Sequence, residues 1–258
     1  MSRNNQQGRG RRFAAIALAV CLVLVTAGGT IAWLTASNKV TNTFTVGQIT
    51  KPDPGPTNPD KPDPTLPDPG KDDGKGNQGK MEGNIYEVFS KDPNLIPGGE
   101  VTKAPYIGIG KGSEDAYVFA YVDNKMMADA ADPAHSTYFT LGKGWASVAG
   151  KATKYTGDGA SEKTYTSGLF VWVDGETEPA PLVGQKELAT WTGELFGSVQ
   201  VPAAAGAADF AQSPTMDVHC FIYAVGNNKA DKGKAATDAA TAWVDGGLKD
   251  VSGTVAPK

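Results

Sequence analysis

The sequence has no arginine outside its first twelve residues. All of its arginines lie there, at Arg3, Arg9, Arg11 and Arg12, and no acidic residue precedes Asp53. Removal of this basic segment would take the formal net charge from −4 to −8. Recognition of phosphates and bases depends on guanidinium groups and clustered positive charge. The composition therefore argues against nucleic acid as a partner of the remaining chain.

Histidine and cysteine are equally scarce. The only histidines are His135 and His219, and neither has the neighbouring Glu and second His of a zinc protease helix. Cys21 lies in an apolar run, so Cys220 is left as a lone thiol without a disulfide partner. Since strand neighbours point to opposite faces, Cys220 is expected to be a buried, inert thiol and His219 a packed or solvated ring.

Motifs for other chemistry are missing as well. There is no G-x-S-x-G nucleophile motif, no complete phosphate-binding loop and no spaced Ca²⁺-loop acids. Most acids, Asp123 among them, are expected to be solvated turn residues. We therefore expect no catalytic residues, no metal, no cofactor and no enzyme activity.

The N-terminus has the order of an export signal: a basic stretch, an apolar run and then small residues. Residues 1–36 are expected to be a signal peptide, cut between Trp33 and Ser37 with a signal peptidase as partner during export. The alternative is a membrane anchor, because residues 13–36 are long enough to cross a hydrocarbon layer of about 30 Å. The protein is accordingly expected to be secreted or at the cell surface, touching the membrane only through this segment, whose apolar region includes Phe13, Leu22, Leu24, Gly28 and Gly29.

Two segments of different character follow. Residues 37–50 alternate apolar and polar side chains, which predicts a β-strand with Val40, Phe44, Val46 and Ile49 as its apolar members. Residues 51–80 are rich in Pro, Asp, Gly and Lys and repeat the triplet Pro-Asp-Pro. Such a segment has too few apolar residues to offset its ordering entropy, so we expect a disordered linker or stalk.

Three stretches resemble a known family. The run GGTIAWLTASNKVTNTFTVGQIT (28–50) resembles the leader and first strand of proteins cut by the SipW-type signal peptidase, the TasA/camelysin biofilm matrix family. LIPGGEVTKAPYIGIGKGSEDAYVFAYVD (95–123) is similar to a family pattern of turn and strand. FIYAVGNNK (221–229) with ATAW (240–243) is similar to its terminal strand-and-Trp signature. The resemblance implies a jelly-roll-like fold and a structural role in an extracellular matrix.

Residues 81–258 are expected to form one all-β domain. Alternating or continuous apolar runs with Gly, Pro and Asp turns predict several short strands, at 116–122, 169–173, 194–201 and 218–225. Short Ala-rich helices are predicted at 203–212 and 235–244, the second capped by Gly246. This pattern predicts a β-sandwich with minor helix, jelly-roll-like if the resemblance holds.

The strand predicted at 37–50 favours assembly, because the unpaired backbone groups of an isolated strand must pair with a sheet edge. It either folds back onto its own domain or is donated to another subunit. Donation would build a fibre from copies of this chain, or from this chain together with other matrix components. The alternative function is a secreted or tethered module that binds carbohydrate or protein. Its contact platform would then be the exposed aromatic residues Trp145, Tyr155, Trp172 and Trp191.

Overall fold

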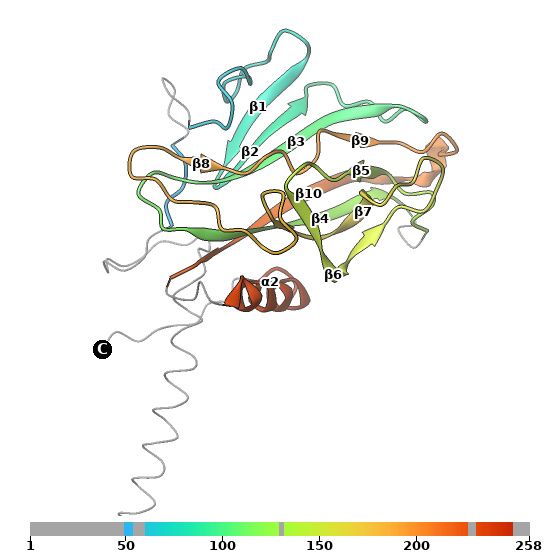
Figure 1. Cartoon of the computed structure of the whole chain (residues 1–258). Coiled ribbons are helices and arrows are strands. Elements are labelled where there is room, and N and C mark those ends of the chain that lie inside the picture. Colours follow the sequence, from blue (N-terminus) through green and yellow to red (C-terminus); the bar gives the residue numbers. More distant parts are fainter. Residues whose placement is uncertain (1–48, 54–59, 129–131, 227–230, 250–258) are drawn as a thin grey trace, which may run out of the picture.

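The computed structural model describes residues 49–53, 60–128, 132–226 and 231–249 (Figure 1). Strands dominate these residues. They are β1 (Asn77–Glu82), β2 (Ile85–Ser90), β3 (Glu100–Ile109), β4 (Ala116–Met127), β5 (Tyr138–Thr140), β6 (Trp145–Lys154), β7 (Thr164–Trp172), β8 (Thr190–Trp191), β9 (Ser198–Gln200) and β10 (Phe210–Ala224). A 3₁₀ turn, η1 (Ala207–Asp209), and an α-helix, α2 (Lys234–Asp245), complete the described elements.

The strands form one antiparallel sheet that curls over itself (Figure 1). The strand order is β1-β2-β3-β9-β5-β7-β4-β10, while β6 pairs with β7 and β8 pairs with β3. The accumulated twist of so many strands favours curling over a flat sheet. The expected all-β class is confirmed.

The strand β4 shows how the curled sheet is filled on both faces. Val118, Ala120 and Val122 point into the main core, which the curled sheet encloses. Tyr117 and Phe119 point to the opposite face, into a second cluster beneath α2. The strand predicted at 116–122 is confirmed, and its continuous apolar run is typical of a strand covered on both faces.

Helix α2 covers that second face (Figure 1). It follows Gly233, whose φ of +80° favours glycine, and it ends at Gly246, whose N–H donates to Ala242 O. Trp243 stacks on Phe221 with ring centroids 5.4 Å apart. The helix predicted at 235–244 and its glycine cap are thus confirmed.

The helix predicted at 203–212 is wrong. The chain makes the 3₁₀ turn η1 and then enters β10 at Phe210, which pairs with Met127 of β4. Phe210 packs near Met127, Val201 and Ala205 in a small cluster. This packing and the low helix propensity of Gly206 outweigh the helix propensity of the alanines.

The strand predictions vary in accuracy at their ends. Those at 169–173 and 218–225 fall largely in β7 and β10, which begin earlier than predicted. The one at 194–201 contains only the short β9. Asp174 and Gly175 form a turn after β7, with positive φ at both residues.

Residues 60–80 differ from the predicted disordered linker, because they pack on the edge of the sheet. Lys61 pairs with Asp68 at 2.7 Å, and Leu66 packs against the cluster around Tyr86. The Tyr86 hydroxyl donates to the carbonyl oxygen of Pro67. Strand β1 begins within the same segment. One leucine anchored beside a buried tyrosine therefore orders a stretch whose composition alone predicts disorder.

Candidate functional site

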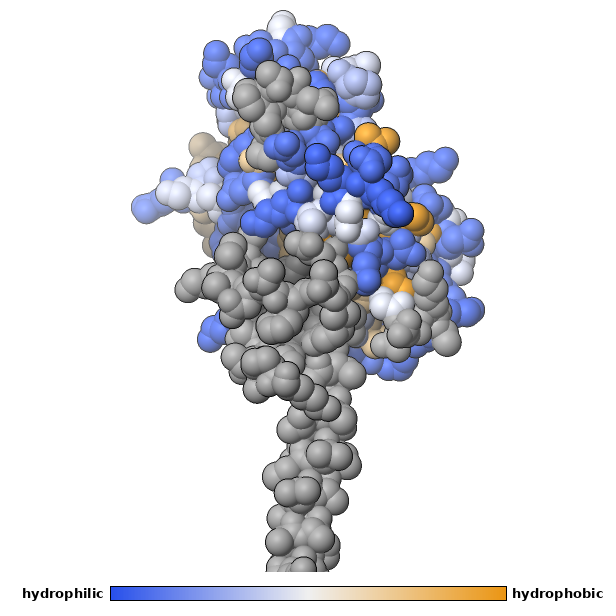
Figure 2. All heavy atoms as spheres, turned by 90° about the vertical axis from the view of Figure 1, so that its left-hand side faces the viewer, coloured by the Kyte–Doolittle hydropathy of each residue, from blue (hydrophilic) through white to orange (hydrophobic). Residues whose placement is uncertain are grey.

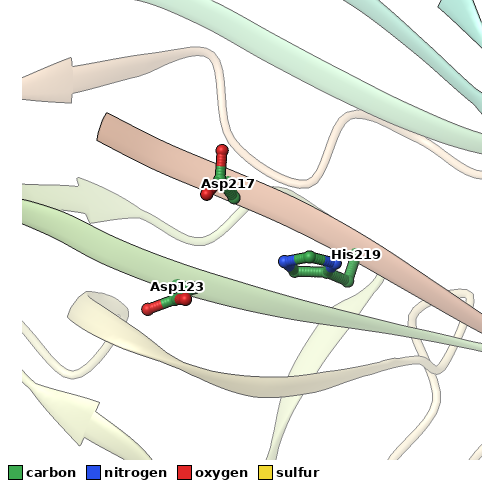
Figure 3. A group of neighbouring side chains, drawn as sticks. All are labelled: Asp123, Asp217 and His219. Atoms are coloured by element: carbon green, nitrogen blue, oxygen red, sulfur yellow. The ribbon is translucent and has the colours of Figure 1, made fainter. Parts of the chain in front are cut away.

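The β4–β10 pairing brings together three side chains that can bind a metal ion. Asp123 lies directly opposite Asp217, and His219 lies two residues further along β10 on the same face. One ligand atom from each residue lies within 4.8 Å of the other two. Figure 3 shows the three side chains gathered beside the two strands. We call them the Asp–Asp–His cluster.

The cluster lies on the sheet face that α2 covers further along. The three side chains differ in solvent exposure: Asp217 is exposed, whereas Asp123 and His219 are half-buried. The ring of Tyr121 lies beside the imidazole of His219, with centroids 6.5 Å apart. Burial raises the pKa of Tyr121, as does the negative charge of Asp123. The phenol therefore stays neutral beside the cluster at ordinary pH.

Lys125 is the cation nearest to these carboxylates in the described structure. Its ammonium donates a hydrogen bond to Asp123, and this bond, followed by the charge of Asp123, raises the Lys125 pKa. The Lys125 side chain is 63% exposed. It therefore neutralises part of the negative charge without closing the site to solvent.

Sequence reasoning missed this cluster. It weighed His219 against a second histidine and treated Asp123 as a turn residue, whereas Asp123 lies inside β4. The sequence did contain one local signal. Asp217 and His219 are two residues apart, so on a strand their side chains share a face. The third ligand comes from strand register, which a single sequence does not reveal.

The N-terminal described segment, residues 49–53, docks on the domain. The Thr50 N–H donates to the Ser113 hydroxyl at 2.9 Å, and its carbonyl accepts from the Gly110 N–H at 2.7 Å. A Cβ on Gly110 would lie 2.3 Å from the carbonyl oxygen of Lys51. The close approach thus requires glycine at position 110.

The same segment reaches the core beside β10. Ile49 packs against the main core cluster, as do Val218 and Cys220 of β10. The charge of Lys51 is close enough to act on the Cys220 thiol. Burial nevertheless dominates and raises the pKa of Cys220 to about 11. Cys220 faces the core while His219 faces outward, and the Cys220 side chain is half-buried, so the expected burial of the thiol is borne out in part.

Three of the four predicted platform aromatics are buried rather than exposed. Trp145, Tyr155 and Trp172 pack in the interior, with Trp145 and Trp172 edge to face at 5.6 Å. Trp191 is half-buried and packs beside Tyr86. Trp145 and Trp172 therefore serve the core of the domain, because large aromatic surfaces are stabilising when buried.

A surface hollow of about 590 Å³ lies near one of these rings. Tyr138 stacks on Tyr155 with centroids 3.8 Å apart, and both line the hollow together with His135 and Asp158. His135 pairs with Asp132 at 2.7 Å, and the hydrogen bond raises the His135 pKa. The hollow thus combines aromatic walls with polar groups.

Apolar surface is scattered on the described part of the chain. Its exposed large apolar side chains are Ile96, Val183 and Leu188. The face drawn in Figure 2 is mainly hydrophilic where it is coloured, with isolated apolar residues. The coloured part of this face thus presents mainly polar residues rather than a continuous apolar patch.

Several predicted residues lie outside the described ranges. They are the export segment with Phe13, Leu22, Leu24, Gly28 and Gly29, and the strand residues Val40, Phe44 and Val46. Ile49 is the one member of the predicted strand set that the structure describes. In the portions of chain that are described, α2 falls short of the length and apolar character needed to cross a membrane.

The chain was compared with protein-family models, with curated proteins and with solved structures, and none of the three comparisons gave a match.

Proposed function

We propose that this protein is an exported cell-surface or extracellular-matrix structural protein that assembles through its N-terminal strand, residues 37–50. The export signal of the sequence and its resemblance to the TasA/camelysin family support this proposal. In the proposal the domain is a jelly-roll-like β-sandwich. Its partners are a signal peptidase during export and, outside the cell, other copies or other matrix components.

The docking of Ile49, Thr50 and Lys51 is the observation that carries the proposal. Thr50 bonds to Gly110 and Ser113, which follow β3. Ile49 packs on the same core cluster as Cys220 of β10, and the charge of Lys51 acts on that thiol. The chain immediately before them therefore starts within reach of β10. A dozen extended residues span roughly 40 Å, enough to follow most of a long strand.

Strand β10 offers a suitable edge. It has 15 residues and stands at the end of the strand order, and among the described residues β4 is its pairing partner. The second edge of such a strand presents backbone N–H and C=O groups that an added strand can pair with. Alternating Val40, Phe44 and Val46 would place their apolar side chains on one face of the sheet.

Donation to the next subunit gives a head-to-tail assembly, whereas pairing within one chain gives a monomer. Each donated strand leaves the next subunit with its own strand to donate, so this contact does not close on itself. The proposed function requires the first arrangement. Calcium, zinc or another cofactor has no part in it.

The test uses the protein recovered from outside the cell. Val40, Phe44 and Val46 are changed together to Ser, and the matched control changes Thr41, Thr43 and Thr45 to Ser. We expect analytical sedimentation to show large assemblies for the unchanged protein and the control, and monomers for the first variant. Assemblies of unchanged size in the first variant would overturn strand donation. N-terminal sequencing of the same material shows whether cleavage falls between Trp33 and Ser37.

The hollow beside Tyr138 and Tyr155 favours one alternative, a secreted or tethered module that binds carbohydrate or protein. Stacked tyrosines with neighbouring polar groups are a common lining for such ligands. This alternative predicts that the unchanged protein sediments as a monomer, so the experiment above separates the two functions.

A further inference from the structure

We propose that Asp123, Asp217 and His219 bind a divalent transition-metal ion, with Zn²⁺ the ion that fits best. This site does not depend on the proposed assembly function. It rests on the positions of three side chains on two adjacent strands, and it would be present in a monomer as well as in a fibre.

The backbone holds the three ligands at a fixed spacing. Asp123 and Asp217 are direct cross-strand partners, and His219 follows Asp217 by two residues, so all three point to one face. Their ligand atoms already lie within 4.8 Å of one another. Around Zn²⁺, ligand bonds of about 2.0–2.2 Å place such atoms roughly 3.4 Å apart. Small side-chain rotations would close that difference without moving the strands.

The ligand types select the ion. One imidazole and two carboxylates suit Zn²⁺, which takes three protein ligands plus water in open sites. Ca²⁺ requires about six to eight oxygen ligands, and Mg²⁺ keeps most of its waters. Among first-row ions the affinity order favours Cu²⁺ and Zn²⁺ over Mn²⁺. The exposed Asp217 leaves the outer side of the site open for the water ligand.

The charges also fit a divalent cation. Two carboxylates and a neutral imidazole carry two negative charges, which one Zn²⁺ balances. Lys125 contacts Asp123 and so competes for one ligand. Because the Lys125 side chain is largely exposed, it can turn into solvent when the ion binds. The Lys125 ammonium thus competes with the metal ion for the Asp123 carboxylate and lowers the affinity of the site for the ion.

The ring of Tyr121 lies beside the imidazole of His219. It lies against the His219 imidazole from the neighbouring strand, which restricts how the histidine can turn. A ligand restricted in this way loses less conformational freedom when the ion binds. The site is therefore partly organised before metal arrives.

The chain contains its own control for this proposal. His135 also pairs with a carboxylate, that of Asp132, at 2.7 Å. Within the described residues, however, the Asp–Asp–His cluster is the one group of three such side chains that lie close enough to share an ion. Since the chain has two histidines, one substitution removes each in turn.

The experiment titrates ZnCl₂ into the metal-stripped full chain, held in detergent because of its apolar N-terminal run, and follows binding by calorimetry. We expect one Zn²⁺ per chain. His219→Ala and Asp217→Asn should each weaken binding on the order of tenfold or more, since even outer-shell changes cost that much at metal sites. His135→Ala should leave the affinity unchanged, and Lys125→Met should raise it.

A second readout locates the ion. Co²⁺ in place of Zn²⁺ should give visible absorption bands of a four- or five-coordinate site, and His219→Ala should abolish them. Circular dichroism of the metal-free variants confirms that they are folded. The proposal is overturned if Zn²⁺ binding is absent, if it survives His219→Ala unchanged, or if His135→Ala abolishes it.

Discussion

The two halves of the β4–β10 ladder share one face of the sheet but differ in composition. In the covered half, Tyr117 pairs with Tyr223 and Phe119 with Phe221, and all four rings lie beneath α2. In the open half, which runs past the end of that cluster, the facing pair is Asp123 and Asp217. The same backbone pairing therefore supports a core in one half and a charged cluster in the other.

Burial beneath another element, rather than strand pairing, decides whether a strand face can hold charged side chains. A charge beneath α2 would lose its water and cost several kcal/mol, on the order of 1–3 even for a neutral polar group. In the open half water reaches the carboxylates, so the sheet can hold them in fixed register at little cost. This combination of rigid backbone and solvent access is what a binding site needs.

The largest expected effect lies in the covered half. Trp243→Ala removes the ring that stacks on Phe221 and should lower the unfolding free energy of the full chain by about 3–5 kcal/mol. Urea unfolding measures this change. The control on the exposed side of α2 is Asp238→Ala, which should cost less than about 1 kcal/mol. A similar loss in both variants would mean that α2 does not anchor this half.

A smaller effect is expected on the opposite face of β10, at Cys220. Burial raises the thiol pKa from 9.0 to about 11. Between these values the unfolded chain loses the thiol proton first and binds fewer protons, so the unfolding free energy falls as pH rises. The fall can reach about 1.4 kcal/mol per pH unit.

The measurement compares the unchanged chain with Cys220→Ser from pH 8 to 10.5. The difference between their unfolding free energies isolates the thiol, because the tyrosines titrate in both proteins. We expect the unchanged chain to lose more stability than the serine variant over this range. Parallel curves would show that Cys220 titrates normally and is open to solvent.

The smallest expected effect is in the open half. Asp217 is exposed, so Asp217→Ala should change the unfolding free energy of the metal-free chain by no more than about 0.5 kcal/mol. Thermal unfolding in the presence of EDTA measures it. A loss as large as that of Trp243→Ala would show that the open half is part of the core after all.

The sequence allowed prediction of the features that depend on local pattern. The apolar run at 116–122 predicted a strand, and the Ala-rich stretch ending before Gly246 predicted α2. Where tertiary packing decides, the sequence misled. Phe210 pairs with Met127 of β4, so β10 begins inside the predicted helix. Leu66 packs on the domain, although it lies in the predicted linker.

The Asp–Asp–His cluster lay beyond single-sequence reasoning for a related reason. Asp123 and Asp217 are far apart in the chain and meet because Val122 pairs with Val218 and Phe119 with Phe221. A shift of one residue in this register would send one carboxylate to the core face. Register follows from how the whole apolar face packs, which no short motif records.

The docking of Thr50 also has a kinetic consequence. Its partner, Ser113, lies 63 positions later in the chain, so a growing or emerging chain presents Thr50 long before the residue that holds it. Closing a loop of that length carries an entropy cost that only later contacts repay, and such non-local contacts form slowly. Thr50 is therefore undocked for a time window that the folding of the domain sets.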